Sequence, residues 1–186
     1  MRLVLLGPPG AGKGTQAKVL SQRLGIPAVS TGDIFRSNIA GATPLGREVQ
    51  GYLDRGDYVP DSVTNAMVRD RLAEPDAAVG FLLDGYPRTT AQVDELDAML
   101  TGAGTKLDRV VEITVDHDEV VARLVRRAAE QGRTDDNESV VRRRLEIYTE
   151  ETAPLAQLYA ERGLLVQVEG TGEVDEVTAR LLAAVG

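Results

Sequence analysis

The sequence has 186 residues, which is enough for one compact domain with a substantial core. Its 21 Lys plus Arg face 29 Asp plus Glu, for a formal net charge of -8, and only 5 Tyr and 2 Phe are aromatic. This balance excludes a general nucleic-acid coat and a base-stacking platform, and the absence of Cys excludes disulfides, thiolate zinc sites and Cys nucleophiles.

Short apolar runs predict the strands of a buried parallel sheet. In chain order they are residues 3–6, 27–30, 79–83, 110–115 and 164–168, of which 27–30 is the weakest candidate. They lack clean alternation, as is typical of strands covered on both faces. Longer helix-like stretches separate them, so the chain is predicted to form an open α/β sheet without an internal repeat or linker.

Two stretches depart from this alternation. Residues 31–59 contain two short helical patterns and no strand, which predicts a small helical insert. Residues 128–132 form a short polar link between two helices that carry arginines. Both could cover a site at the carboxyl edge of the sheet, where ligands bind in this architecture.

Residues 7–15, Gly-Pro-Pro-Gly-Ala-Gly-Lys-Gly-Thr, follow the first strand and open the first helix. Glycines let backbone N–H groups surround phosphate oxygens, the helix N-terminus adds partial positive charge, and Lys13 adds a full charge. The generic phosphate loop has Ser or Thr directly after Lys, whereas here Gly14 precedes Thr15. A glycine-rich turn with a solvated lysine is the plainer interpretation, but the strand before and the helix after favour a nucleoside triphosphate site.

Residues 84–88, Asp-Gly-Tyr-Pro-Arg, end the third apolar run. Asp84 there can hold the water shell of Mg²⁺ beside the phosphate loop, or it can cap the helix that begins near Thr89. The guanidinium of Arg88 is expected to project outward from the carboxyl edge of the sheet. In residues 30–36, Thr31 or Asp33 could cap a helix and place Arg36 one turn into it.

The segment 116–131 begins with the spacing of a capping box, Asp116 and Glu119. Arg123 and Arg127 are four apart and share one stripe, whereas Arg126 is expected to be solvated. The predicted apolar face comprises Val120, Val121, Leu124, Val125 and Ala128. The lone His117 is expected at the surface.

The next helix is predicted to have the apolar stripe Val141, Leu145 and Tyr148. Arg143 points away from that stripe, and Arg142 and Arg144 flank it, so either of these two can face a site. The plainer interpretation of the region is an amphipathic hairpin with solubilising arginines. A triphosphate site in the same chain favours arginines that bind phosphates.

No apolar run approaches 18 residues, and residues 1–7 are too short for a signal peptide. We therefore expect a soluble, cytoplasmic protein with no membrane or nucleic-acid partner.

Taken together, these motifs resemble the adenylate kinase family, nucleoside monophosphate kinases that convert ATP and AMP to two ADP. The matching segments are residues 7–15, 30–33, 80–88, 133–136 and 152–155, in the family's order along essentially the whole chain. The Gly after Lys13 is itself the family's form. The resemblance implies a P-loop NTPase-type three-layer α/β fold, with a roughly five-stranded parallel sheet flanked by helices.

The resemblance also implies one nucleotide kinase domain with a core at 1–29, 60–126 and 134–186, a monophosphate-binding insert at 30–59 and a lid at 127–133. Many bacterial relatives have a longer lid, sometimes with a Cys-based zinc site. Here five residues separate Arg127 from Arg133 and there is no Cys, so a short lid without zinc is expected. Whether Asp135 or Asp136 matters in lid closure stays open.

The resemblance assigns the site residues as follows. The residues implied for ATP are Gly10, Ala11, Gly12, Lys13, Gly14, Thr15, Arg123, Arg127 and the backbone of Gly172. Those implied for AMP are Thr31, Arg36, the backbone of Asp57, Tyr58 and Val59, then Gly85, Tyr86, Pro87, Arg88, Gln92, Arg133 and Arg144. Arg123 would stack on the ATP base, Gln92 would read the adenine edge of AMP, and Arg144 is selected over Arg142. The implied catalytic group is Lys13, Arg88, Arg127, Arg133 and Arg144, with Asp84 acting on Mg²⁺ through water.

The hypothesis is in-line phosphoryl transfer from Mg-ATP to AMP by a monomer. The acceptor phosphate is already an anion, so catalysis would come from positioning and charge neutralisation rather than from a strong base. A UMP/CMP kinase is the nearest alternative, but such relatives typically have Ala and Asn where this chain has Thr31 and Gln92. A non-catalytic nucleotide sensor needs one nucleotide site, whereas this sequence offers candidates for two. Thr64 stands where some relatives carry an apolar residue near the AMP base, a difference that the sequence leaves unexplained.

Overall fold

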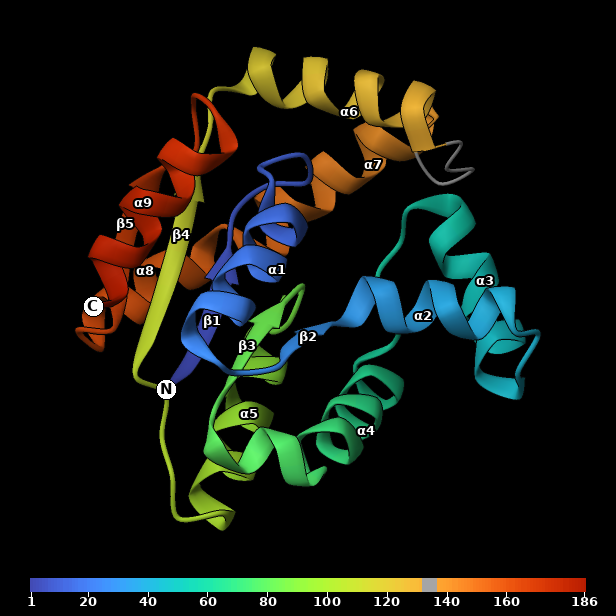
Figure 1. Ribbon diagram of the computed structural model, residues 1–186. Coiled ribbons are helices and arrows are strands. Elements are labelled where there is room, and N and C mark those ends of the chain that lie inside the picture. The colour runs from blue at the N-terminus through green and yellow to red at the C-terminus, as the bar shows by residue number, and fades with distance from the viewer. Residues whose placement is uncertain (132–136) are drawn as a thin grey trace.

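A computed structural model describes residues 1–131 and 137–186, without the side chains of residues 127–131. The chain forms a central sheet of five parallel strands in the order β2-β3-β1-β4-β5 (Figure 1). The strands are β1 (Arg2–Leu6), β2 (Ala28–Ser30), β3 (Phe81–Asp84), β4 (Arg109–Thr114) and β5 (Leu165–Glu169). The predicted parallel α/β sheet is confirmed, including its weakest strand.

Helices cover both faces of this sheet. In β1, Leu3 and Leu5 pack in a cluster with side chains of α1 (Lys13–Leu24) and α9 (Val174–Val185). Val4 and Leu6 point the other way and pack with α5 (Thr90–Gly102) and α8 (Pro154–Glu161). All four β1 side chains are buried, which is why the run lacks alternation. The predicted three-layer fold is therefore confirmed.

The third strand begins later than predicted. Residues Pro75–Val79 form a 3₁₀ helix, η1, and the side chain of Val79 is 69% exposed. Gly80 then adopts φ +142° and leads into β3. Hydrophobicity made Val79 look like a strand residue, but its position before the glycine turns it to solvent.

Residues 31–59 contain α2 (Thr31–Ala40) and α3 (Pro44–Arg55), and α4 (Asp61–Leu72) leads back to the sheet. A separate apolar cluster of Phe35, Val49, Leu53 and Val59 holds this part together. Figure 1 shows α2 and α3 projecting on the side of β2. The predicted pair of helices without a strand is confirmed, but neither Thr31 nor Asp33 is the cap. The side chain of Ser30, which is still extended at the end of β2, accepts from Asp33 N.

The helices α6 (His117–Gln131) and α7 (Glu138–Ile147) lie beyond the carboxyl ends of the strands, and a π-helical turn η3 (Tyr148–Thr152) leads to α8 (Figure 1). The predicted apolar face of α6 is correct for two of its four described members, and the side chain of Ala128 lies outside the described residues. Val120 and Leu124 are buried, whereas Val121 is 36% and Val125 66% exposed, because only one side of the helix contacts the phosphate loop.

The capping box predicted for α6 does not form. Asp116 Oδ1 accepts from Asp118 N, and the Glu119 carboxylate instead pairs with Arg123, one turn further on. None of the helices in the described parts of the chain is long and apolar enough to cross a membrane.

Candidate active site

A cavity of about 650 Å³ opens at the carboxyl ends of β1 and β3. The predicted nucleotide-site residues that line it are Gly10, Gly12, Lys13, Gly14, Thr15, Thr31, Arg36, Asp57, Tyr58, Val59, Asp84, Gly85, Pro87, Arg88, Gln92, Arg123 and Arg144. Ala11 and Tyr86 are buried, and neither they nor Gly172 belongs to this lining. Segments that lie far apart in the sequence thus share one cavity of a size typical for small ligands.

The phosphate loop joins β1 to α1. Gly10 has φ +88°, and a side chain there would lie 3.0 Å from both the Leu124 side chain and Val120 O of α6, so the close approach of α6 requires glycine. Lys13 Nζ donates to Gly7 O at 2.6 Å and to Pro8 O at 2.9 Å. The ammonium group therefore lies within the curve of the loop, at the N-terminus of a helix, where an anion is favoured.

Asp84 lies beside this loop at the end of β3, in register with Leu5. Its Oδ2 would be 3.6 Å from a Cβ on Gly14, and its carboxylate makes no hydrogen bond or ion pair to the described residues. Thr89, not Asp84, caps α5, so the capping interpretation of Asp84 is wrong. A single unpartnered carboxylate beside a phosphate loop suits Mg²⁺, which is commonly held by one or two carboxylates, water and substrate phosphates. The described residues contain no cluster of three or more His, Cys, Asp or Glu that could hold a metal.

Two contacts fix the Arg88 side chain in the same cavity. Its Nε donates to Gly85 O at 2.7 Å, and its guanidinium lies 4.9 Å from the ring centre of Tyr58. Gly85 has φ +81°, and a Cβ there would come within 2.8 Å of Thr31 Oγ1 and 2.9 Å of the Arg88 guanidinium. Only glycine fits between these two groups, which explains the Gly that precedes Tyr-Pro-Arg.

A hydroxyl relay connects Tyr58 to Arg88. Thr152 Oγ1 donates to Arg88 O at 2.8 Å and lies 2.7 Å from the Tyr58 hydroxyl. Because Thr152 has one hydroxyl hydrogen and Arg88 O can only accept, Tyr58 is the donor in the second bond. Neither Thr152 nor Tyr148, which also lines the cavity, was predicted as a site residue, although Thr152 opens the family-like segment 152–155.

Positive charge gathers around Arg88. Burial lowers the pKa of Arg88, and the nearby cations Arg144 and Arg36 lower it further, while Tyr58 and Asp84 act in the opposite direction. Arg36 also pairs with Asp33 at 2.5 Å, on the first turns of α2. Such a group of cations around one cavity is electrostatically matched to a polyanion.

Among the arginines of α6 and α7 whose side chains the structure describes, only Arg126 differs from the expectation. Arg144 lines the cavity, whereas Arg142 is exposed and pairs with Glu138, which settles the alternative left open by helical geometry. Arg143 is not part of the cavity lining and pairs at 3.2 Å with Asp57, which is part of it. Arg126, expected to be only solvated, lines the cavity as well, because α6 lies across its mouth.

The Arg127 side chain, Arg133, Asp135 and Asp136 lie outside the described residues. His117 is exposed, as predicted.

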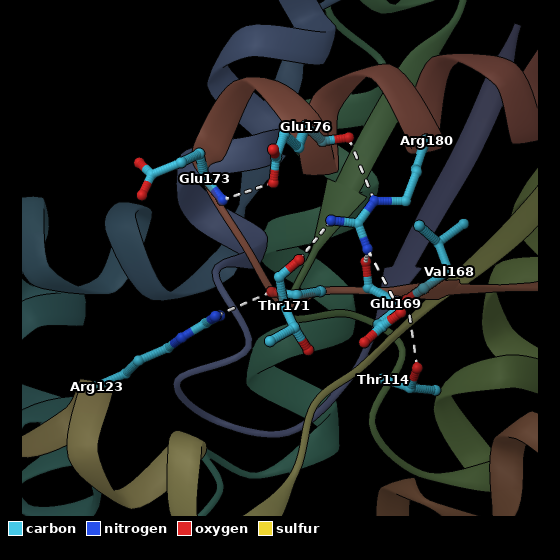
Figure 2. A network of polar contacts seen from close by, with 9 residues as sticks. Thr114, Arg123, Val168, Glu169, Thr171, Glu173, Glu176 and Arg180 are labelled. Carbon is cyan, nitrogen blue, oxygen red and sulfur yellow. Dashed lines mark hydrogen bonds and ion pairs between the residues drawn. The ribbon is translucent and has the colours of Figure 1, made fainter.

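The turn after β5 lies next to Arg123 (Figure 2). Arg123 bonds Glu119 through Nε at 2.8 Å and Gly170 O through Nη2 at 3.0 Å. Arg180 of α9 holds the same turn from the other side, donating to Glu169 O at 2.6 Å and to Thr171 O. Two arginines thus occupy three consecutive backbone carbonyls just before Gly172, which has φ +105°.

Gln92 and Thr64 are buried and line the same cavity as Arg88. Gln92 lies on the first turn of α5, and Thr64 donates to Val59 O at 3.4 Å. Thr64 therefore brings a satisfied polar group to a position where the resemblance suggested an apolar one.

Comparison with known proteins gives a consistent result over nearly the whole chain. The profile of the adenylate kinase family matches residues 5–164. The chain is 60% identical to an adenylate kinase of Nocardioides sp. over 184 residues, covering 99% of this chain and 96% of the relative. It is 60% identical to an adenylate kinase of Kocuria rhizophila over 183 residues (98% and 97%) and 58% identical to one of Thermobifida fusca over 184 residues (99% and 97%).

Proposed function

The chain belongs to the adenylate kinase family and is an ATP:AMP phosphotransferase, and from this premise we propose which residues perform the reaction. ATP phosphates bind in the loop of residues 7–15, and the AMP phosphate binds at Arg36 and Arg88. The observation that carries this assignment is that Lys13 and Arg88 line one continuous cavity from different strand ends. A donor and an acceptor phosphate can therefore meet between them.

Charge neutralisation and alignment are the main catalytic contributions in this proposal. Lys13 and Arg88 hold the donor and acceptor phosphates, and Arg144 reaches the same cavity from α7. Arg127 and Arg133 complete the group by resemblance. The AMP phosphate is an anion at neutral pH and needs no strong base, so positioned cations supply the stabilisation that the transition state requires.

Asp84 is the proposed protein contact of Mg²⁺, through the metal's water shell. When bound, the ion supplies further neutralisation of the ATP phosphates. The support is its carboxylate, which lies beside Gly14 and makes no hydrogen bond or ion pair to the residues that the structure describes.

The adenine bases of ATP and AMP are proposed to bind at opposite ends of the site. The turn at Gly170–Gly172 with Arg123 receives the ATP base, and Gln92 reads the AMP base. Closure of residues 30–59 over AMP, and of a short lid at 127–133, would exclude water that competes as acceptor. Because one chain supplies both nucleotide sites, we propose that the enzyme acts as a monomer, in the cytoplasm by family resemblance.

A monophosphate panel tests the proposal. ATP and Mg²⁺ are mixed separately with AMP, CMP, UMP and GMP, and ADP formation is followed for the wild-type protein and for Gln92→Ala. We expect a strong preference of the wild-type protein for AMP, and a weakened preference with unchanged KM for ATP in the variant. Preference for UMP or CMP would favour the pyrimidine kinase alternative, and no stimulation by any monophosphate would favour a sensor.

A further inference from the structure

We infer that Asp61 is a positioning residue that fixes the side-chain amide of Gln92 in one orientation and thereby sets the enzyme's preference for the base of the monophosphate. The inference rests on the proposed role of Gln92. Asp61 is not part of the cavity lining and lies behind Gln92, so any effect on the substrate must pass through that amide.

Two hydrogen bonds join Asp61 to the start of α5, and a third links their two donor residues. Asp61 Oδ1 accepts from Gln92 Nε2 at 2.6 Å, and Oδ2 accepts from Thr89 Oγ1 at 2.9 Å. Thr89 Oγ1 in turn accepts from Gln92 N at 3.2 Å as the cap of the helix. Both carboxylate oxygens of Asp61 therefore serve to place one residue, and they link the first residue of α4 to the start of α5.

The bonds also determine which way the Gln92 amide faces. A carboxylate can only accept, so the Gln92 NH₂ group must face Asp61. On the other side, Arg88 N donates to Gln92 Oε1 at 2.7 Å, so the amide oxygen must face Arg88. A reversed amide would put NH₂ against an N–H and oxygen against a carboxylate, and both contacts would be lost.

The fixed amide keeps one N–H and one oxygen lone pair for a ligand, because each of its polar atoms has one partner on the protein. Adenine presents a ring acceptor next to an amino donor, which matches this pair, whereas a 6-oxopurine presents a ring donor next to a carbonyl acceptor. An amide free to rotate could serve both bases. The amide held by Asp61 cannot turn over without leaving buried polar groups unpaired, so it discriminates against the 6-oxopurine.

The test compares AMP with IMP as acceptors, because these differ at the 6-position edge without the added amino group of GMP. The variants are Asp61→Ala, Asp61→Asn and Asp61→Ser; the last shortens the side chain while still suiting a helix start. Asp70→Ala is the matched control, since Asp70 lies on the same helix, is exposed and makes the same charge change. For each protein, kcat and KM are measured for AMP and IMP at saturating ATP, and KM for ATP at saturating AMP.

We expect Asp61→Ala and Asp61→Ser to lower the AMP-to-IMP ratio of kcat/KM about tenfold, mainly through KM for AMP, with KM for ATP changed less than about twofold. Asp61→Asn keeps most of the preference, because its oxygen can accept from Gln92 while its NH₂ donates to Thr89. Asp70→Ala behaves as wild type. Equal losses for AMP and IMP, or an Asn variant as impaired as Ala, would overturn the inference.

The Gln92→Ala variant distinguishes the inference about Asp61 from the proposed role of Gln92 in reading the AMP base. Loss of base preference in Gln92→Ala but not in Asp61→Ala would overturn only the role of Asp61. Full preference in Gln92→Ala would overturn the proposed role of Gln92 and the inference together.

Discussion

Two cationic side chains of this protein, Lys13 and Arg88, are held in fixed positions in the cavity by neighbouring groups. Lys13 lies inside the phosphate loop against two carbonyls, and Arg88 is oriented by Gly85 O and the Tyr58 ring. The formal charge of the whole chain is -8, so the cavity is a local concentration of cations in an acidic protein. Preorganised cations of this kind cost little reorganisation when a transition state forms.

Removal of the loop cation should therefore be severe. We expect Lys13→Ala to lose at least ~10²-fold in kcat, by analogy with loss of one preorganised charge-stabilising donor. Lys106→Ala is the matched control, because Lys106 is exposed and lies in the connection before β4. Coupled measurement of ADP formation checks both variants, and near-wild-type turnover by Lys13→Ala would contradict the mechanism.

At the scale of elements, contacts between segments hold the two ends of the site. Arg180 of α9 and Arg123 of α6 bind the carbonyls of the turn after β5 from either side (Figure 2). On the other side of the cavity, Asp57 after α3 pairs with Arg143 of α7. Each contact joins segments that lie far apart in the sequence.

Arg180 should affect ATP and not AMP. Without its guanidinium, the carbonyls of Glu169 and Thr171 lose their donor, and the turn proposed to receive the ATP base becomes less ordered. We expect Arg180→Ala to raise KM for ATP about threefold to tenfold, with KM for AMP unchanged. Arg162→Ala, which breaks an ion pair with Asp97 elsewhere, is the control. Steady-state kinetics with each substrate varied in turn measure the effect, and an equal rise in both KM values would argue against it.

The Asp57–Arg143 pair should contribute modestly to stability. Its side chains are 30% and 49% exposed, so a double-mutant cycle with Asp57→Asn and Arg143→Ala should give a coupling of about 0.5 kcal/mol in urea unfolding at pH 7. The contribution should shrink in high salt.

The pH dependence of the stability that this pair contributes follows from the pKa of Asp57. Hydrogen bonding to Arg55, and then to Arg143, lowers the pKa of Asp57 from its ordinary value of 3.8. A lowered folded-state pKa means that the stabilisation is present above 3.8 and is lost as the pH falls through the folded-state value. A coupling that grew on acidification would contradict this assignment.

At the scale of the whole molecule, the parallel sheet brings the site together. The ends of β1, β2 and β3 deliver the phosphate loop, Thr31 and Asp84, while α6 and α7 complete the cavity from the later half of the chain. The apolar clusters on the two faces of the sheet keep these ends in register. The charged side chains of the site lie outside these clusters, so we expect core packing to affect stability more than chemistry.

A core substitution tests that expectation. Leu83 of β3 is fully buried between β1 and β2, so Leu83→Ala should lower the free energy of unfolding by about 3 kcal/mol while kcat at 25 °C stays near wild type. Val79→Ala is the matched control: Val79 belongs to the same apolar run, but its 69% exposed side chain should make the change cost less than about 0.5 kcal/mol. Denaturant unfolding and activity assays measure both quantities.

Local patterns in the sequence were sufficient for the existence of five strands, the phosphate loop, the two helices of residues 31–59 and the choice of α/β class. These features depend on periodicity and turn chemistry within about ten residues, which a sequence carries directly. The assignment of roles to Arg123, Gln92 and Arg144 came from resemblance to a family, since helical geometry alone left Arg142 and Arg144 equivalent.

The tertiary structure decided which side chains meet. Val79 and Val125 are apolar yet exposed, Arg126 faces the cavity, and Ser30 rather than Thr31 caps α2. Asp61 reaches Gln92 across 31 positions of sequence, and Arg180 reaches the turn after β5. Sequence determined the elements and their chemistry because those are local; burial and pairing followed from packing between distant segments, which no local pattern specifies.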